Sequence, residues 1–155
     1  LSNRIGRYAP RTRFAEAFMV TDGGDVRAQS FLGFFTLIEK IERDANPVAV
    51  RRLPESANGQ PDMTGGFILA IDKGPTDFAA GGRWLEFVYP KAEDMARPER
   101  RPQLDFIRGY IDAFSQAARP PNFRHPATGQ HYGELIDVDA WIDHHIIKSS
   151  NRKIH

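Results

Sequence analysis

Hydrophobic residues form short, dense clusters in the first half of the chain and follow helical spacing in the second half. The densest cluster runs from Phe31 to Ile38 and is followed directly by Glu39 and Lys40. Aromatic and β-branched residues in such a run are typical of a buried strand. Because a sheet holds the end of a strand rigidly, a charged residue placed there is a candidate binding group. Glu39 therefore either contacts a ligand or simply ends the strand.

The first half predicts further strands separated by turns. A strand over residues 14–20 and a turn cluster at 21–25 predict a hairpin with the Phe31 strand. Two more strands are expected over residues 67–72 and 84–89, with a turn at 74–82 and a polar surface loop at 44–61. Gly65-Gly66 and Gly81-Gly82 lack the spacing of phosphate-binding loops, so turn glycines are the better interpretation.

The second half predicts helices. After a charged connection at residues 90–102, apolar residues recur three and four positions apart over 103–118. A second helix is expected over residues 137–147, with Asp137 as its N-cap. Residues 1–5 are expected to be the end of another helix, stopped by Gly6. The predicted fold is α+β, with an antiparallel hairpin or meander followed by two or more helices.

Composition narrows the possible functions only slightly. The 155 residues fit one domain or a piece of a larger one. A net charge of +1 gives no general attraction to nucleic acid, and no apolar run approaches the length of a membrane span. The absence of cysteine excludes disulfides, thiolate metal sites and a cysteine nucleophile. The chain opens on Leu1 rather than Met, which favours a piece of a longer protein.

Acidic residues and histidines gather in the second predicted helix, but metal binding is not expected there. The acidic run that begins at Asp137 lacks the glycine of a calcium loop, and Lys148 stands where the loop needs a glutamate. Acids in a first helical turn are better explained by the helix dipole. His144 and His145 are adjacent and point to different faces, so His145, on the apolar face, is expected to be a hydrogen-bonded core residue.

Four arginines lie near the start of the chain, at Arg4, Arg7, Arg11 and Arg13. They either face an anion or cover a solvated surface. No serine, histidine and acid fall in a recognisable nucleophilic motif. The residues by themselves thus predict an α+β domain without an assigned reaction.

Four blocks of the sequence resemble the CotH kinase family, in family order. They are Asn3-Arg4-Ile5-Gly6-Arg7-Tyr8-Ala9-Pro10-Arg11-Thr12-Arg13-Phe14, Gly33-Phe34-Phe35-Thr36-Leu37-Ile38-Glu39-Lys40-Ile41, Thr64-Gly65-Gly66-Phe67-Ile68-Leu69-Ala70-Ile71-Asp72-Lys73 and Ile136-Asp137-Val138-Asp139-Ala140-Trp141-Ile142-Asp143-His144-His145. The resemblance covers most of the chain up to about Ile147. It implies a partial protein-kinase-like domain over residues 1–147 and a divergent tail over 148–155.

The resemblance also implies a function and a site. Better-known family members use ATP and magnesium to phosphorylate serines of spore-coat or surface proteins. The hairpin would belong to the N-lobe of the kinase, with Glu39 at the hinge that binds adenine. Phe35 and Leu37 would lie near the apolar adenine slot, and Lys73 would either flank the nucleotide or only end its strand. The implied partners are therefore ATP and a serine-containing coat or surface protein.

The chain departs from the family where phosphate is transferred. The catalytic-loop Asn and Asp should follow the Trp141 helix, but residues 148–155 do not match, and His155 stands about where the Asp is expected. The Trp-Asp-Phe-Asp metal-binding segment is absent, and a phosphate-contacting Lys would precede residue 1. No catalytic residue or metal ligand is therefore expected in this chain, which should not bind ATP or magnesium tightly and should be inactive alone.

Two other interpretations stay open. In the first, the chain is a non-catalytic assembly or adhesin module on the same scaffold, with Trp84 and residues 122–125 as candidate contacts. In the second, it is a truncated product without a function of its own. With flanking lobes missing, apolar surface of the hairpin and of Trp141 is expected to stay exposed and to favour association.

Overall fold

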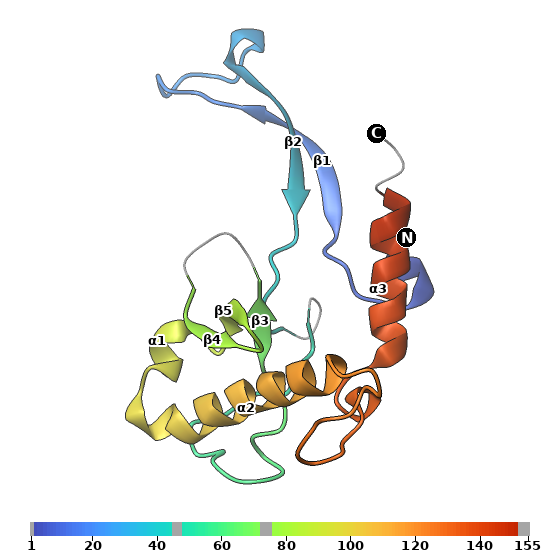
Figure 1. Cartoon of the computed structure of the whole chain (residues 1–155). Coiled ribbons are helices and arrows are strands. Elements are labelled where there is room, and N and C mark those ends of the chain that lie inside the picture. Colours follow the sequence, from blue (N-terminus) through green and yellow to red (C-terminus); the bar gives the residue numbers. More distant parts are fainter. Residues whose placement is uncertain (1, 45–47, 72–75, 152–155) are drawn as a thin grey trace.

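The computed structural model of the chain describes residues 2–44, 48–71 and 76–151, which form a long hairpin and a mixed α+β body (Figure 1). Its strands are β1 (Thr12–Phe18), β2 (Phe31–Ile38), β3 (Ile68–Ala70), β4 (Phe78–Ala80) and β5 (Arg83–Tyr89). Its helices are α1 (Ala92–Met95), α2 (Arg101–Ala118) and α3 (Val138–Asn151), with short 3-10 helices η1 (Ser2–Ile5), η2 (Ala28–Ser30), η3 (Pro98–Arg100) and η4 (Tyr132–Glu134). The predicted α+β class is confirmed.

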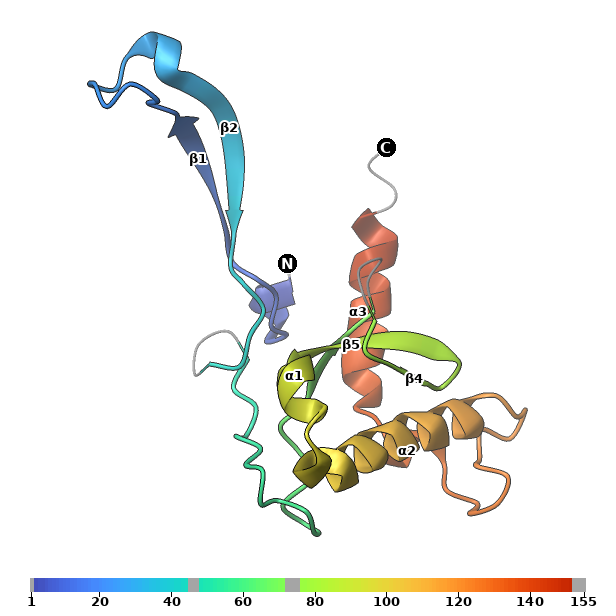
Figure 2. The ribbon, with the colours of Figure 1, turned by 90° about the vertical axis from the view of Figure 1, so that its left-hand side faces the viewer.

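Strands β1 and β2 form the predicted antiparallel hairpin. Their register pairs Thr12 with Ile38 and Ala17 with Gly33, and a bulge after Ala17 shifts the last pair to Phe18 with Phe31. The hairpin extends away from the body in both side views (Figures 1 and 2). It forms a sheet of its own, separate from the three strands of the body.

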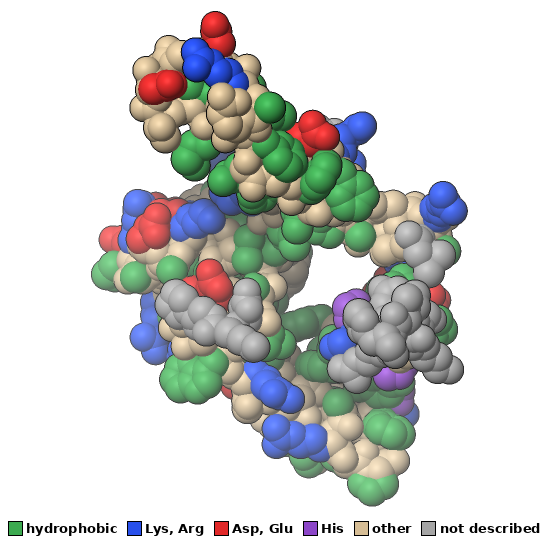
Figure 3. Space-filling view, turned by 90° about the horizontal axis from the view of Figure 1, so that it is seen from above, with side chains coloured by type: hydrophobic (Ala, Val, Ile, Leu, Met, Phe, Trp, Pro, Cys, Tyr) green, Lys and Arg blue, Asp and Glu red, His purple; other side chains and the backbone are tan. Residues whose placement is uncertain are grey.

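The prediction that the Phe31 strand is buried is wrong. Phe34 on β2 is 76% exposed, and Phe14 on β1 is 89% exposed. Two strands cannot cover their own faces, and within the described residues no second layer packs on them. Hydrophobic side chains consequently line the hairpin at the top of Figure 3. The expectation that the hairpin and Trp141 leave apolar surface exposed is confirmed.

The body is built on a three-stranded antiparallel sheet of order β3-β5-β4. The amphipathic helix α2 packs against this sheet, and their side chains form the core. The rings of Phe78 and Phe87 stack there with centroids 4.6 Å apart. The buried members of the core are Phe78, Ala80, Leu85, Phe87, Met95 and Ile107.

Three connections have more structure than the sequence pattern predicts. The predicted turn at 74–82 contains β4, and the charged connection at 90–102 contains α1 and η3. The predicted surface loop at 44–61 has no helix or strand in its described part, yet Leu53 and Ala57 are buried. Tertiary contacts outweigh local polarity here, because Gln103 of α2 lies fully buried beneath this loop. Its amide nitrogen is within hydrogen-bonding distance of three loop carbonyls, those of Pro54 at 2.8 Å, Ala57 at 3.2 Å and Glu55 at 3.3 Å.

The turn between β4 and β5 is fastened to α2. Gly81 adopts a φ of 60°, which confirms the prediction of a turn glycine. Its N–H donates to Asp112 Oδ1 at 2.6 Å, and its carbonyl accepts from Ser115 Oγ at 3.1 Å. A Cβ at this position would lie 3.1 Å from Ile111 Cγ2, so the helix and the turn approach closely.

Helix α3 starts as predicted. Asp137 caps it, since the Ala140 N–H donates to Asp137 Oδ1 at 2.9 Å. The helix leads away from the end of α2 and passes beside η1 (Figure 1). His145 is exposed, so the prediction of a core histidine is wrong. The helix packs only part of its apolar face, and its last turns extend beyond the body.

Candidate functional site

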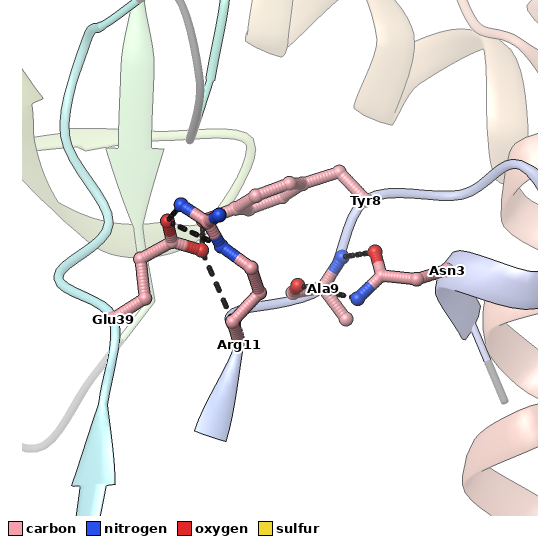
Figure 4. Close-up of polar contacts among 5 residues, drawn as sticks. All are labelled: Asn3, Tyr8, Ala9, Arg11 and Glu39. Atoms are coloured by element: carbon pink, nitrogen blue, oxygen red, sulfur yellow. Dashed lines mark hydrogen bonds and ion pairs between the residues drawn. The ribbon is translucent and has the colours of Figure 1, made fainter. Parts of the chain in front are cut away.

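The site predicted at Glu39 lies where β2 ends and β1 begins (Figure 4). We call this end of the hairpin, with the chain from Asn3 to Arg11 that leads into it, the foot. Glu39 N–H donates to the Arg11 carbonyl at 2.9 Å, which extends the β1–β2 ladder by one pair. Arg11 N–H donates to Glu39 Oε2 at 3.1 Å, and Arg11 Nε donates to Glu39 Oε1 at 3.0 Å. Arg11 Nη2 also donates to Oε1. The carboxylate is thus held by both the backbone and the guanidinium of one residue.

Two further side chains complete this foot. Tyr8 Oη donates to Glu39 Oε2 at 3.4 Å. Asn3 fixes the approach of the chain, because its amide donates to the Ala9 carbonyl at 2.9 Å and accepts from the Ala9 N–H at 2.8 Å. The Glu39 side chain is only 14% exposed. Glu39 was expected either to contact a ligand or to end the strand. The geometry favours the second interpretation, because its carboxylate is occupied in closing the hairpin.

The ionisation of these groups follows from their contacts. The hydrogen bond from the Arg11 guanidinium lowers the pKa of Glu39, and the Arg11 N–H lowers it further. The same bond raises the pKa of Arg11. Burial raises the pKa of Tyr8, and the negative charge of Glu39 adds to that effect. At neutral pH the foot therefore holds one carboxylate, one guanidinium and one neutral phenol.

A second polar link joins the foot to α3. Arg7 Nε donates to Asp143 Oδ2 at 2.7 Å, and Arg7 Nη1 donates to Asp137 Oδ2 at 3.3 Å. The hydrogen bond to Asp143 raises the pKa of Arg7. Of the four arginines near the start of the chain, Arg7 and Arg11 thus face anions, and these anions are carboxylates of this chain.

The other predicted nucleotide contacts are only partly placed. Phe35 and Leu37 share one face of β2, opposite Ala15 and Arg13 of β1, and both side chains are exposed. Along the chain, Leu37 is followed two positions later by Glu39. Lys73 lies outside the described residues.

The segment after Glu39 keeps unpaired backbone groups. Among the described residues, no hydrogen bond involves the backbone of Lys40 or Ile41. The Lys40 ammonium pairs with Glu42 at 3.1 Å and so turns toward its own segment. In this short stretch of the foot, main-chain donors and acceptors stay available to a ligand.

A second feature, an apolar hollow of about 470 Å³, was not predicted. It lies between β4–β5, α2 and α3, and Trp141 of α3 contacts Phe114 of α2 across it with ring centroids 5.4 Å apart. The helical spacing of Tyr110, Phe114 and Trp141 indicated apolar faces but gave no sign of a space between them. Its apolar lining comes from Ile71, Ala80, Leu85, Tyr110, Ile111, Phe114, Ala118, Ile136 and Trp141.

A metal site needs several ligating side chains close together, and a membrane-spanning helix must be long and apolar. Across residues 2–44, 48–71 and 76–151 no three His, Asp or Glu side chains gather in a way that could hold a metal ion. No helix in the same ranges is long and apolar enough to span a membrane.

Comparisons with family models, curated proteins and solved structures gave no match. The resemblance to the CotH kinase family therefore stays a prediction.

Proposed function

We propose that this chain is the hinge-containing part of a CotH-type, ATP-dependent serine kinase domain, and that it does not transfer phosphate alone. In this proposal the hairpin β1–β2 belongs to the nucleotide-binding lobe, and the body with α2 and α3 begins the second lobe. The observation that carries the proposal is the foot of the hairpin. There an exposed apolar strand face leads through a fixed Glu39 into a segment with free backbone groups.

The foot is suited to adenine because it combines two kinds of contact. A flat purine ring needs an apolar surface and a few polar groups that fix its orientation. Phe35 and Leu37 supply exposed apolar surface on one face of β2. Lys40 and Ile41 supply unpaired N–H and C=O groups beyond its end. Glu39 acts as a positioning residue, since its carboxylate is already held by Arg11 and Tyr8.

Phosphate transfer needs metal ligands, and the described residues do not gather three of them at this place. Metal ions and cationic groups neutralise the transferred phosphate, and a carboxylate positions the nucleophile. The Arg7 and Arg11 guanidinium groups nearest the foot are each committed to carboxylates of this chain. ATP and magnesium would therefore bind only weakly, and a serine-containing coat or surface protein would not be phosphorylated by this chain alone.

Nucleotide binding tests the proposal directly. Amide chemical shifts are recorded while ATP is added to millimolar concentration, and changes are expected at Phe35, Leu37, Lys40 and Ile41. Leu37→Ala should weaken these changes, whereas Ile38→Ala, on the opposite face of β2, should leave them intact. Shift changes confined to the body, or equal effects of both variants, would contradict adenine binding at the foot. Turnover of labelled ATP on a serine-rich basic substrate would contradict the proposed inactivity.

A second candidate function is a non-catalytic assembly or adhesin module. The observation that favours it is a strained, exposed aromatic residue, because Phe123 has a φ of 55° and half of its surface is open to solvent. Trp84 on β5 is also exposed. Capture of a surface or coat protein that is lost in Phe123→Ala but survives Glu39→Ala would favour this function over the kinase.

A further inference from the structure

The outer edge of β2 is open and carries no charge. Within the described residues β2 pairs only with β1, so its second edge has no partner strand. Residues 31–38 contain no charged residue and no proline. A long, apolar, unpaired edge of this kind is a template for another strand, because natural edges are normally protected by charges, prolines or a covering element.

The edge of β1, unlike that of β2, carries charged side chains, which hinder pairing with another strand. β1 carries the charges of Arg13 and Glu16, and Arg11 directly precedes it. All three residues are exposed. Charged side chains on an edge strand oppose the addition of an identical strand, since like charges would meet or would lose water. The two edges of the hairpin are therefore unequal, and β2 is the receptive one.

The register shows which backbone groups of β2 point outward. The bond from Glu39 N–H to the Arg11 carbonyl marks Arg11 and Glu39 as a hydrogen-bonded pair. Such pairs alternate along an antiparallel ladder, so Leu37, Phe35 and Gly33 bond inward to β1. The intervening residues Phe34, Thr36 and Ile38 direct their N–H and C=O groups to the free edge.

We propose that β2 pairs with β2 of a second copy of this chain, antiparallel and about a two-fold axis. The occupant is a second copy because an identical uncharged strand can meet β2 without burying any charge. Outward-facing residues of one strand meet outward-facing residues of the other, which places Thr36 opposite Phe34 of the second copy. Exposed aromatic side chains of adjacent strands then cover one another on both faces.

The proposed assembly stops at two copies. After pairing, the four strands have the order β1-β2-β2-β1, and both outer edges carry Arg13 and Glu16. These charged edges oppose further addition, so the assembly is a closed dimer and not a growing fibre. This inference does not depend on the proposed kinase function, because it concerns a strand edge and not the nucleotide contacts at the foot.

Matched lysine variants test the proposal in the full chain. Thr36 on β2 and Thr12 on β1 are both exposed, lie on the same face of the hairpin and present outward backbone groups. Sedimentation equilibrium should show a monomer–dimer equilibrium for the unchanged chain. Thr36→Lys should raise the dissociation constant by about tenfold or more, while Thr12→Lys should leave it within about twofold. Circular dichroism checks that both variants keep the fold.

A spin label gives a second measurement that does not depend on weakening the dimer. The chain has no cysteine, so Thr36→Cys and Thr12→Cys each provide a single labelling position. Labels at position 36 would lie within about 10 Å of each other on the central strands. Labels at position 12 would be separated by about 14 Å across the sheet and by roughly 20 Å more along it, because Thr12 pairs with Ile38 at the end of β2, so dipolar broadening is expected at 36 and not at 12. A monomer at about 1 mM chain, equal effects of the two lysines, or broadening only at position 12 would overturn the proposal.

Discussion

Arg7 and Asp143 lie 136 positions apart in the sequence, yet Arg7 Nε donates to Asp143 Oδ2 at 2.7 Å. This bond joins the chain at the foot of the hairpin to the middle of α3. Asp137, the N-cap of the same helix, accepts a second bond from Arg7 at 3.3 Å. One guanidinium thereby fixes both the start of α3 and its direction relative to η1.

Removing this link should loosen the start of the chain without unfolding the body. In Asp143→Asn the charge on the acceptor is lost, so amides of residues 2–9 should exchange with deuterium faster, while amides of α2 keep their rates. Asp139→Asn is the matched control, since Asp139 lies on the same helix and adds only the weakest attraction to Arg7, without an ion pair among the described residues. Equal exchange in the two variants would show that Arg7 does not depend on Asp143.

Acid should open the foot of the hairpin. The pKa of Glu39 is lower in the fold than its ordinary value of 4.5, so its contribution to stability is fully present above that value. The contribution is lost as the pH falls through the lowered pKa, because the protonated carboxyl no longer attracts Arg11. Protection of the Glu39 and Arg11 amides, relative to the intrinsic exchange rate at each pH, should therefore decrease as the solution is acidified through that lowered pKa. Glu39→Gln should show lower protection already at neutral pH, with little further change in acid.

Two glycine substitutions in the body should have opposite effects. Gly81→Ala forces a side chain into a φ of 60° and against Ile111 and Ser115, so we expect a loss of about 1 kcal/mol or more in the free energy of unfolding. Gly109→Ala lies within α2, where nothing lies within 4 Å of the added carbon, and should gain up to about 1 kcal/mol. Urea unfolding measures both, and a neutral Gly81→Ala would show that the turn can move away from α2.

The buried glutamine beneath the 50s loop should be costly to replace. Gln103 is fully buried and donates to the carbonyls of Pro54 and Ala57. Gln103→Ala therefore leaves the Ala57 carbonyl without a donor among the described residues, while the Pro54 carbonyl keeps only the Ala57 N–H. We expect a loss of about 2 kcal/mol in the free energy of unfolding. Gln116→Ala, an exposed position on the same helix, should change it by less than about 0.5 kcal/mol. A small effect of Gln103→Ala would mean that water replaces the lost donor.

Local sequence signals predicted the regular elements well. The hairpin, α2, the Asp137 cap and the turn glycines all follow from apolar spacing and from side-chain oxygens or glycines at defined positions. These features depend on neighbouring residues, so a single sequence contains the information. The short elements β4, α1 and η3 were missed because tertiary contacts stabilise them. Met95 illustrates this, since it sits in a charged stretch yet is buried in the core.

The site was harder to predict than the fold. The sequence indicates that the Phe31 strand ends in a polar residue with a role of its own. It does not indicate the partners of Glu39, which are Arg11 and Tyr8, 28 and 31 positions earlier. Burial of the strand was inferred from its composition, whereas burial depends on whether a second layer covers it. Neither a distant ion pair nor a missing layer leaves a periodic signal in the sequence.

The way in which the hairpin is attached determines how its direction responds to solution conditions. Its foot is tied to α3 through Arg7 and two carboxylates that water can reach. Ions screen such contacts strongly, whereas they barely affect the core around Phe78. Raising the ionic strength should therefore widen the range of angles that the hairpin explores while the melting temperature of the body stays nearly constant. Salt would then act on the orientation of this arm independently of the stability of the fold that carries it.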